Sequence, residues 1–484
     1  MRSSFAAVDL GATSGRVVLG TFSHTGAAPT AFQLDEVHRF PNNPMTIEGE
    51  LCWDVENLFE QTLIGLSLAF SCAQDNNSTL SGIAVDSWGV DYGLVDESLN
   101  LVAPVRHYRA AEEVYVHRAN MLVSPREAYA RTGITELPIN TCFQLIRDCQ
   151  QGLLTQGVAA LLIPDLWTAW LTGVRGTEQT IASTTGLLDW ESHDWAYDLA
   201  HQWGIPESVL TEVVETGSMA GRTLAPITER IGAVNPIPVY RAPAHDTASA
   251  FAAVTSPDTD AAVVSCGTWA LVGCLNPEPV LAHNAEQAGL TNEVAADGSA
   301  LLVRNLSGTW LLEECLRAWS SHDSSVQPKD IEALRFDLLA AAESESAQVL
   351  GTIDCGAPQL IGTRDMPAEI LALYQQTHGD AHGPLELGRH QIVRLILESL
   401  AESFARTISN IGEIAHRNFR EVIMIGGGSR INQLVGLTEH ATGLSVQIKH
   451  QEATSIGNIC VQAVSAGIFD SIDQARAATN TNGN

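Results

Sequence analysis

The sequence contains no apolar run of the ~18 residues that a helix needs to cross a bilayer. Its N-terminus also lacks a long apolar segment followed by a cleavage site, because Met1 to Ser4 lead directly into a strand-like stretch at 5–10. We therefore expect a soluble protein that is not exported.

Basic residues are scarce, with 26 Lys and Arg against 56 Asp and Glu, which gives a formal net charge of −30. A surface with this charge repels nucleic acid backbones and anionic lipid, so neither nucleic acid nor a membrane is an expected partner. An anionic nucleotide can still bind, because backbone N–H groups, a few cations and a bound metal act locally, within a Debye length of roughly 8 Å. A homodimer is the candidate assembly of the chain.

The nine cysteines are odd in number and scattered, and they form neither a C-x-x-C pair nor a Cys/His cluster with zinc spacing. This pattern indicates neither a zinc finger nor a disulfide framework. A reduced, cytoplasmic location is expected.

With 484 residues and 45% hydrophobic residues, the chain is long and apolar enough for two large lobes. Apolar strands are predicted at 5–10 and 16–20, an amphipathic helix at 55–70 and another strand at 82–86. Alternation of strand and helix predicts an α/β lobe. A second pair of apolar strands, within 262–273, repeats the opening hairpin and predicts a duplicated architecture, divided into 1–252 and 253–484.

The turn of the first hairpin, 11–15, follows Asp9 and contains two glycines and two hydroxyl side chains. Backbone close to a ligand, hydroxyls and an adjacent carboxylate would suit phosphate and hydrated Mg²⁺. Neither the G-x-x-x-x-G-K-[ST] loop nor the G-x-G-x-x-G fingerprint occurs here, and the alternative is a simple β-turn.

The second hairpin keeps Gly267 and Thr268 but has Ser265 near the place that corresponds to Asp9. This difference predicts that one lobe holds the metal and that the other holds phosphate through neutral donors. The glycine run 426–428 follows a predicted strand at 421–425, where open α/β sheets bind ligands. A plain strand-to-helix turn would also require glycine.

Asp246 lies at a predicted helix start, where a carboxylate in a cleft could accept a hydroxyl proton during phosphoryl transfer. The alternative is a helix N-cap. Trp88 is either a sugar platform or a core residue, and Asp86 and Asp91 are either acids or turn residues. The remaining tryptophans of the middle region are interpreted as core: Trp167, Trp170, Trp190, Trp195 and Trp203.

The order of these motifs resembles that of the FGGY carbohydrate kinases over nearly the whole chain. The resemblance is carried by 8–16 (VDLGATSGR), 85–93 (VDSWGVDYG), 107–109 (HYR), 132–140 (TGITELPIN), 162–166 (LIPDL), 182–186 (ASTTG), 245–249 (HDTAS), 266–269 (CGTW), 304–305 (RN) with Gly308, and 456–458 (IGN).

This resemblance implies two actin-like (ribonuclease H-like) lobes that close over ATP, Mg²⁺ and an open-chain ketose. It implies Asp246 as general base and transfer of the γ-phosphoryl group to O1 of L-rhamnulose, with Mg²⁺ near Asp9. Sugar contacts are expected at Trp88, Gly89, His245, Thr247 and Asn305. Nucleotide contacts are expected at Ala12, Thr13, Ser14, Gly15, Arg16, Thr268, Glu313, Gly426 and Gly427.

Two departures from the family pattern stand out. Where the family usually has Asn-Glu-Gly-Gly, this chain has 292–296 (NEVAA), on the sugar side. Glu313 occupies a position where the family often has a nucleotide-contacting Gln.

Two alternatives remain. Another ketose kinase of the same family would act on L-fuculose, L-xylulose or D-xylulose. A nucleotide-switched actin-like binding protein is the second alternative, because fold does not fix function.

Overall fold

The computed structural model describes residues 2–25, 28–322, 331–344, 349, 351–360, 365–379, 387–450 and 452–480. The chain forms two compact units, each built from separate stretches. The first consists of Met1–Pro257, Leu275–Leu302 and Glu452–Asn484, and the second of Asp258–Cys274 and Val303–Gln451. The contiguous division into 1–252 and 253–484 remains a proposal about domains.

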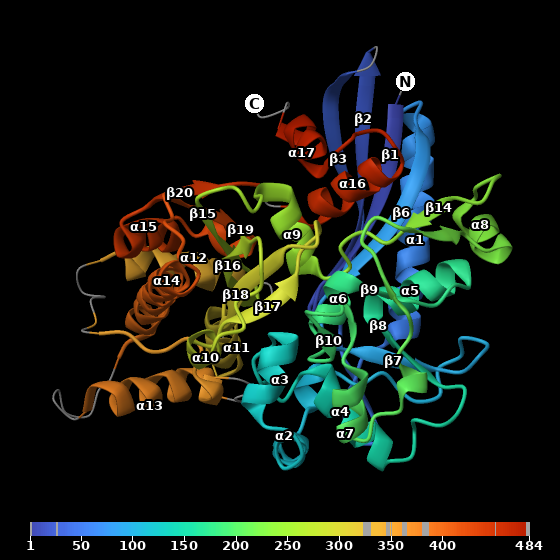
Figure 1. The fold of residues 1–484 in the computed structure, drawn as a ribbon. Helices are drawn as coiled ribbons and strands as arrows, with labels where there is room; N and C mark the ends of the chain where they lie inside the picture. Colours follow the sequence, from blue (N-terminus) through green and yellow to red (C-terminus); the bar gives the residue numbers. More distant parts are fainter. Residues whose placement is uncertain are drawn as a thin grey trace. The chain divides into compact units, whose positions relative to one another are not determined.

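The first unit contains a six-stranded sheet with the order β13-β14-β6-β1-β2-β3 (Figure 1). The predicted opening hairpin is present, since β1 pairs antiparallel with β2, and β1 also pairs parallel with β6. The bounds are β1 (Arg2–Leu10), β2 (Ser14–Thr25), β3 (Ala28–Pro41), β6 (Thr79–Ser87), β13 (Met219–Arg222) and β14 (Pro238–Tyr240).

Helices α1 (Val55–Asp75) and α16 (Ala453–Ser465) pack on this sheet. A Cβ atom added to Gly65 of α1 would lie 2.4 Å from a methyl of Val17, and one added to Gly20 would lie 2.7 Å from Ile459 of α16. Since residues 17 and 20 of a strand point to opposite faces, the two helices cover opposite faces of the sheet.

Helix α9 (Asp246–Val254) lies beside α16 in the first unit (Figure 1). The two helices approach so closely that a Cβ on Gly457 would lie 1.8 Å from the carbonyl oxygen of Ser249. Glycine at position 457 therefore allows α16, near the C-terminus, to pack directly against α9, the helix that begins with Asp246.

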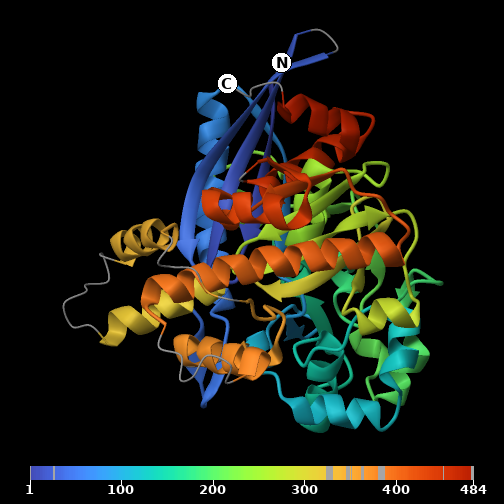
Figure 2. The ribbon, with the colours of Figure 1, turned by 90° about the vertical axis from the view of Figure 1, so that its left-hand side faces the viewer.

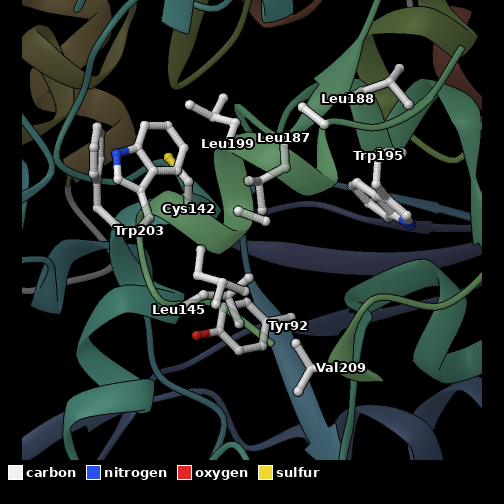
Figure 3. Close-up of a cluster of buried hydrophobic side chains, with 14 of the residues drawn as sticks. Tyr92, Cys142, Leu145, Leu187, Leu188, Trp195, Leu199, Trp203 and Val209 are labelled. Atoms are coloured by element: carbon white, nitrogen blue, oxygen red, sulfur yellow. The ribbon is translucent and has the colours of Figure 1, made fainter. Parts of the chain in front are cut away.

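The remainder of the first unit is made of short elements around a core that includes Tyr92, Cys142, Trp195 and Trp203 (Figure 3). The interpretation of the tryptophans as core is correct for Trp167, Trp190, Trp195 and Trp203, while Trp170 is half-buried. The elements are β4 (Met45–Ile47), β5 (Glu50–Cys52), β7 (Tyr92–Val95), η1 (Tyr108–Ala110), α2 (Glu113–Asn120), α3 (Pro125–Thr132), α4 (Thr141–Gln150), β8 (Ala159–Leu162), α5 (Ile163–Thr172), β9 (Thr177–Glu178), α6 (Gln179–Ser183), β10 (Leu188–Asp189), β11 (Asp194–Trp195), α7 (Tyr197–Gln202), η2 (Glu207–Val209), β12 (Val213–Val214), α8 (Ala225–Ile231), α10 (His283–Gln287), β17 (Thr291–Val294) and α17 (Ile472–Thr479).

The second six-stranded sheet has the order β17-β18-β16-β15-β19-β20. The predicted hairpin of β15 with β16 is present, and the predicted long amphipathic helix is α14 (Figure 2, orange). The bounds are β15 (Ala261–Cys266), β16 (Trp269–Asn276), β18 (Ala300–Ser307), α11 (Trp310–His322), α12 (Ile331–Ala342), η5 (Pro358–Leu360), α13 (Met366–His378), α14 (Arg389–Ile414), β19 (Glu421–Ile425), η7 (Gly427–Arg430), α15 (Asn432–Thr442) and β20 (Ser445–Ile448).

The two sheets repeat one arrangement, as the sequence predicts. In each, the first strand pairs antiparallel with the next strand of the chain and parallel with a strand that follows a long helix, β6 after α1 and β19 after α14. Within the described ranges, the structure has no helix long and apolar enough to cross a membrane.

Candidate active site

The first hairpin turn is closed by a hydrogen bond from Gly11 N to Ser14 O of 3.0 Å. Asn42 holds this turn from outside, because its side chain donates to Gly11 O at 2.9 Å and its backbone N donates to Thr13 O at 3.0 Å. Thr13 at the tip is exposed. The turn therefore presents a fixed backbone to solvent, and sequence reasoning did not identify Asn42.

Gly15 is required because it packs against a ring on the neighbouring strand, a contact that the sequence pattern does not show. A Cβ at this position would lie 2.3 Å from the ring of Phe40 on β3. Gly15 is thus fixed by packing within the sheet, whereas Ala12 and Ser14 are partly exposed.

Asp9, at the end of β1, is buried and forms an ion pair with Arg16, with 2.6 Å between Arg16 Nη2 and Asp9 Oδ2. Arg16 also pairs with Glu452, and Ser455 Oγ donates to the same Asp9 oxygen at 3.4 Å. The proposed metal carboxylate is therefore held by a cation on the next strand and by α16.

Asp86 is paired with Asp9 in the register of β1 and β6 and is fully buried. Its alternative interpretation as a turn residue is wrong, since it lies within a strand. Asn458 Nδ2 donates to Asp86 Oδ2 at 2.6 Å, whereas Asp86 Oδ1 is buried without a hydrogen-bond partner. Burial, and after it the charge of Asp9, raise the pKa of Asp86 well above its ordinary value.

Trp88 follows β6 and is buried against Trp53, with 4.4 Å between the ring centroids. Both indole N–H groups donate to Asp91 Oδ2, at 3.0 Å from Trp88 and 2.6 Å from Trp53. Burial raises the pKa of Asp91 to about 7, although these hydrogen bonds oppose the rise. Asp91 is therefore a buried anchor for two tryptophans, and it also closes a tight turn, because its backbone N donates to Gly89 O at 2.9 Å.

Gly89 lies between these residues, and a Cβ there would contact the Thr184 side chain at 3.1 Å. The next residue, Val90, has a φ of 69°, which is unusual for a β-branched side chain. Its backbone is held on both sides, because Val90 N donates to Thr184 Oγ1 at 3.3 Å and Thr141 Oγ1 donates to Val90 O at 2.7 Å. The segment that carries Gly89 is consequently fixed by Thr184 and Thr141.

The segment His245 to Thr247 opens helix α9. The N-cap residue of this helix is His245, so the alternative interpretation of Asp246 as the cap is wrong. His245 N donates to Thr180 Oγ1 at 3.2 Å, and Thr247 Oγ1 donates to Asp246 Oδ1 at 3.2 Å. The Asp246 side chain retains 33% exposure, while Thr247 is buried.

Two charged neighbours flank His245. Its Nδ1 atom lies 2.9 Å from Oε2 of Glu293, and its Nε2 atom lies 3.5 Å from Oδ1 of Asp246. Burial opposes protonation, but the attraction of these carboxylates outweighs it and raises the pKa of His245 to about 9. For Asp246, burial raises the pKa above its ordinary value and His245 opposes that rise.

The altered sugar-side segment 292–296 begins in β17. Val294 and Ala295, which stand where the family usually has glycines, are 3% and 1% exposed, and Val294 belongs to the core of the first unit. The extra side chains thus fill the core.

In the second unit, Gly267 and Thr268 form the turn between β15 and β16. Gly308 N donates to Thr268 O at 3.1 Å, and a Cβ on Gly308 would lie 2.4 Å from Gly267 O. Asn305, on β18, is half-buried. That the turns 11–15 and 267–268 face one cleft remains a prediction.

The glycines after β19 have different reasons to be glycine. Gly426 has a φ of 81° and Gly428 packs so closely on Cys266 that a Cβ would lie 2.5 Å from its sulfur. A Cβ on Gly427 would meet nothing within 4 Å. Backbone conformation and packing therefore explain Gly426 and Gly428, and they leave Gly427 unexplained.

Glu313 lies on α11 and forms an ion pair with Arg335 of α12, with 2.6 Å between Oε1 and Nη1. Its backbone N donates to Thr309 O at 3.0 Å. The carboxylate therefore has a cationic partner within its own unit, which is a structural reason for Glu at this position.

Family models assign two domains to this chain: the N-terminal domain of the FGGY family of carbohydrate kinases matches residues 5–253, and the C-terminal domain matches residues 262–466. The chain belongs to the FGGY family of carbohydrate kinases. As a member of this family it is a sugar phosphotransferase, and ATP is its expected phosphoryl donor.

Several relatives of this FGGY kinase match it along nearly their whole length. The chain is 34% identical to "Rhamnulokinase" of Bacteroides thetaiotaomicron, with 96% of this chain and 92% of the relative covered. It is 32% identical to "Rhamnulokinase" of Klebsiella pneumoniae, with coverages of 98% and 92%, and 29% identical to that of Oceanobacillus iheyensis, with coverages of 98% and 96%.

Solved structures share the fold of this FGGY kinase at lower identity. The xylulose kinase of Rhodospirillum rubrum matches with a TM-score of 0.76 at 18% identity, over 99% of this chain and 92% of that one. The glycerol kinase of Plasmodium falciparum with ADP matches with a TM-score of 0.74 at 15% identity, over 99% and 92%. The expected class of two actin-like α/β lobes is confirmed.

Proposed function

We propose that this chain transfers the γ-phosphoryl group of ATP to O1 of L-rhamnulose, which gives L-rhamnulose 1-phosphate and ADP. The observation that carries the proposal is the match, over nearly full length, to relatives named rhamnulokinase at 29–34% identity. The geometry around His245, Asp246 and Thr247 supports it, because it offers a partly exposed carboxylate beside a cationic ring.

Asp246 is the proposed general base. As O1 attacks the γ-phosphorus, the O1–H proton passes to the Asp246 carboxylate, the new O–P bond forms, and the bond to the ADP leaving oxygen breaks. Asp246 suits this role because its carboxylate is not used as the helix cap and is reachable from solvent. His245 and Thr247 would hold sugar hydroxyls next to it.

The sugar is proposed to contact Gly89, His245, Thr247 and Asn305, with Trp88 as a wall. Asp91 supports this role of Trp88, because it accepts a hydrogen bond from Trp88 Nε1 and so fixes the orientation of the indole ring. The close packing of Gly89 on the Thr184 side chain fixes the backbone that the sugar would contact.

The nucleotide is proposed to contact two turns and the glycine run. In the first turn the contacts are Ala12, Thr13, Ser14, Gly15 and Arg16. In the second unit they are Thr268, Gly426, Gly427 and Glu313. The open space around Gly427 supports a close approach of nucleotide there, whereas Glu313, paired with Arg335, would contact nucleotide only through its remaining acceptor capacity.

A hydrated Mg²⁺ near Asp9 is part of the proposal. No group of three or more His, Cys, Asp or Glu side chains in the described ranges is arranged as a metal cage. One carboxylate fits Mg²⁺ nevertheless, because this ion usually keeps several waters and takes its other ligands from substrate phosphates. When bound, it would neutralise charge on those phosphates.

A coupled ADP-release assay tests the function directly. Purified protein with ATP and Mg²⁺ should release ADP fastest with L-rhamnulose, and at least tenfold more slowly with L-fuculose, L-xylulose or D-xylulose. Fastest release with one of those sugars would make the chain another ketose kinase of the family. ADP release that no sugar stimulates would instead favour a nucleotide-switched binding protein.

A cytoplasmic location is also proposed, since all nine cysteines are free thiols and the reaction consumes ATP. A homodimer stays a prediction, which light scattering on the purified protein would test.

A further inference from the structure

The ring of His245 lies between two carboxylates with different surroundings. Glu293 contacts Nδ1 at 2.9 Å and is 6% exposed, while Asp246 lies 3.5 Å from Nε2 and is 33% exposed. The His245 side chain itself is 9% exposed. One carboxylate is therefore buried with the ring, and the other is partly exposed.

The position of Glu293 is fixed by the residues on either side of it in β17. Asn292 Oδ1 accepts from Val280 N at 2.7 Å, and Asn292 N donates to Gly133 O at 2.8 Å. Val294 N donates to Ser183 Oγ at 2.9 Å. Since neighbouring residues of a strand point to opposite faces, anchoring Asn292 and Val294 directs the Glu293 side chain toward His245.

Three carboxylates act on the ring: Glu293, Asp246 and Glu178. Glu178 is already satisfied, because it accepts hydrogen bonds from Thr180, Thr216 and Ala244 N. A buried carboxylate needs a charged or hydrogen-bonding partner, and His245 is the cation in direct contact with Glu293. This pairing agrees with the raised pKa of His245, about 9.

We propose that Glu293 is a positioning residue for phosphoryl transfer, which keeps the His245 ring protonated and oriented with Nε2 toward Asp246. The inference rests on the proposed function, in which Asp246 accepts the O1–H proton. A protonated His245 favours the ionised form of Asp246, the form able to take a proton. When the ring loses a proton at alkaline pH, the tautomer that keeps Nδ1–H toward Glu293 leaves an unprotonated Nε2 facing Asp246, so the carboxylate loses the cationic group that orients it.

The test replaces Glu293 by Gln, which keeps the size of the side chain and removes its charge. Glu286→Gln is the matched control, because Glu286 contacts His283 Nδ1 at the same distance of 2.9 Å, but at the surface, where His283 is 59% exposed. The ring of His245 is followed by NMR titration and assigned by its absence in His245→Asn.

In the parent protein and in E286Q, His245 should titrate near pH 9. In E293Q its midpoint should fall by at least one pH unit. The alkaline limb of kcat/KM for L-rhamnulose should move down with it, because this limb reports the free enzyme. A purely structural role for Glu293 would lower activity at all pH values and leave the alkaline limb in place, and this result would overturn the proposal.

The titration also separates this inference from the function on which it rests. It needs no substrate, so a high midpoint that falls in E293Q, in a protein that does not phosphorylate L-rhamnulose, would support the pair and reject the function. If E293Q does not fold, the parent titration decides, since a His245 midpoint near the ordinary 6.5 contradicts the proposal.

Discussion

Asn458 donates a hydrogen bond of 2.6 Å to Asp86, a residue 372 positions earlier in the chain. Gln462, one turn further along α16, donates to Asn458 Oδ1 at 2.7 Å and to Ala6 O at 3.1 Å. A helix near the C-terminus thus supplies the polar partners of two strands of the first sheet. The segment 456–458, singled out in the sequence, is explained by these contacts.

Replacing Asn458 by Ala should destabilise the protein by about 1–3 kcal/mol, because it leaves both oxygens of the buried Asp86 without a partner. The folded-state pKa of Asp86 is raised, so its contribution to stability is present at low pH and is lost as the pH rises. The variant raises this pKa further, so its deficit should grow as the pH rises through the folded-state pKa of Asp86 and should not shrink between pH 5 and pH 8. Urea unfolding at both pH values measures it.

Ser465→Ala on the same helix is the control for this prediction, since Ser465 Oγ donates to Val461 O within α16. Its effect should be small and equal at the two pH values. A loss in Asn458→Ala that becomes smaller at the higher pH would mean that Asp86 is not the group responsible.

Asp246→Asn should retain the fold and most sugar binding and lose phosphoryl transfer by about 10²–10⁴, at the low end of that range if the transition state is loose. The fold is retained because the cap of α9 is His245, so the amide replaces no capping carboxylate. Thermal melting, calorimetry with L-rhamnulose and turnover are measured on the same preparation. Turnover within a factor of about three of the parent would exclude Asp246 as the base.

Asp9→Asn should weaken activity and its dependence on Mg²⁺ far more than Asp35→Asn. Asp9 adjoins the turn 11–15 and pairs with Arg16, whereas Asp35 accepts from Gln33 on an exposed part of β3. Activity is titrated with Mg²⁺ for both variants. Equal effects would remove Asp9 from the proposed metal site.

Gly427→Ala and Gly428→Ala should affect different properties, although the positions are adjacent: the first the KM for ATP, and the second the stability of the fold. A methyl group added at Gly428 would lie 2.5 Å from Cys266 Sγ, so G428A should lower stability by roughly 1–3 kcal/mol through overpacking. A methyl group added at Gly427 meets no atom within 4 Å, so G427A should melt like the parent and raise the KM for ATP severalfold. An unchanged KM in G427A would argue against nucleotide contact there.

Local sequence patterns determined much of the fold. Period-2 and helical patterns predicted β1, α1, β6, the hairpin of β15 with β16, α14 and β19, because each pattern reports a face that must be buried. The repeated hairpin predicted the duplicated sheet arrangement, and the order of the motifs predicted the family.

The tertiary structure decided which residues meet, since contacts between distant segments leave no periodic signal in the sequence. Asn42 at the first turn, Asn458 at Asp86 and Glu293 at His245 are of this kind. The reasons for single glycines were also tertiary: Gly15 is required by Phe40 and Gly457 by Ser249 O. A sequence alone names the residue types able to do chemistry. Their burial and charged neighbours, which set the pKa of His245 and Asp246, exist only once the chain has brought those neighbours together.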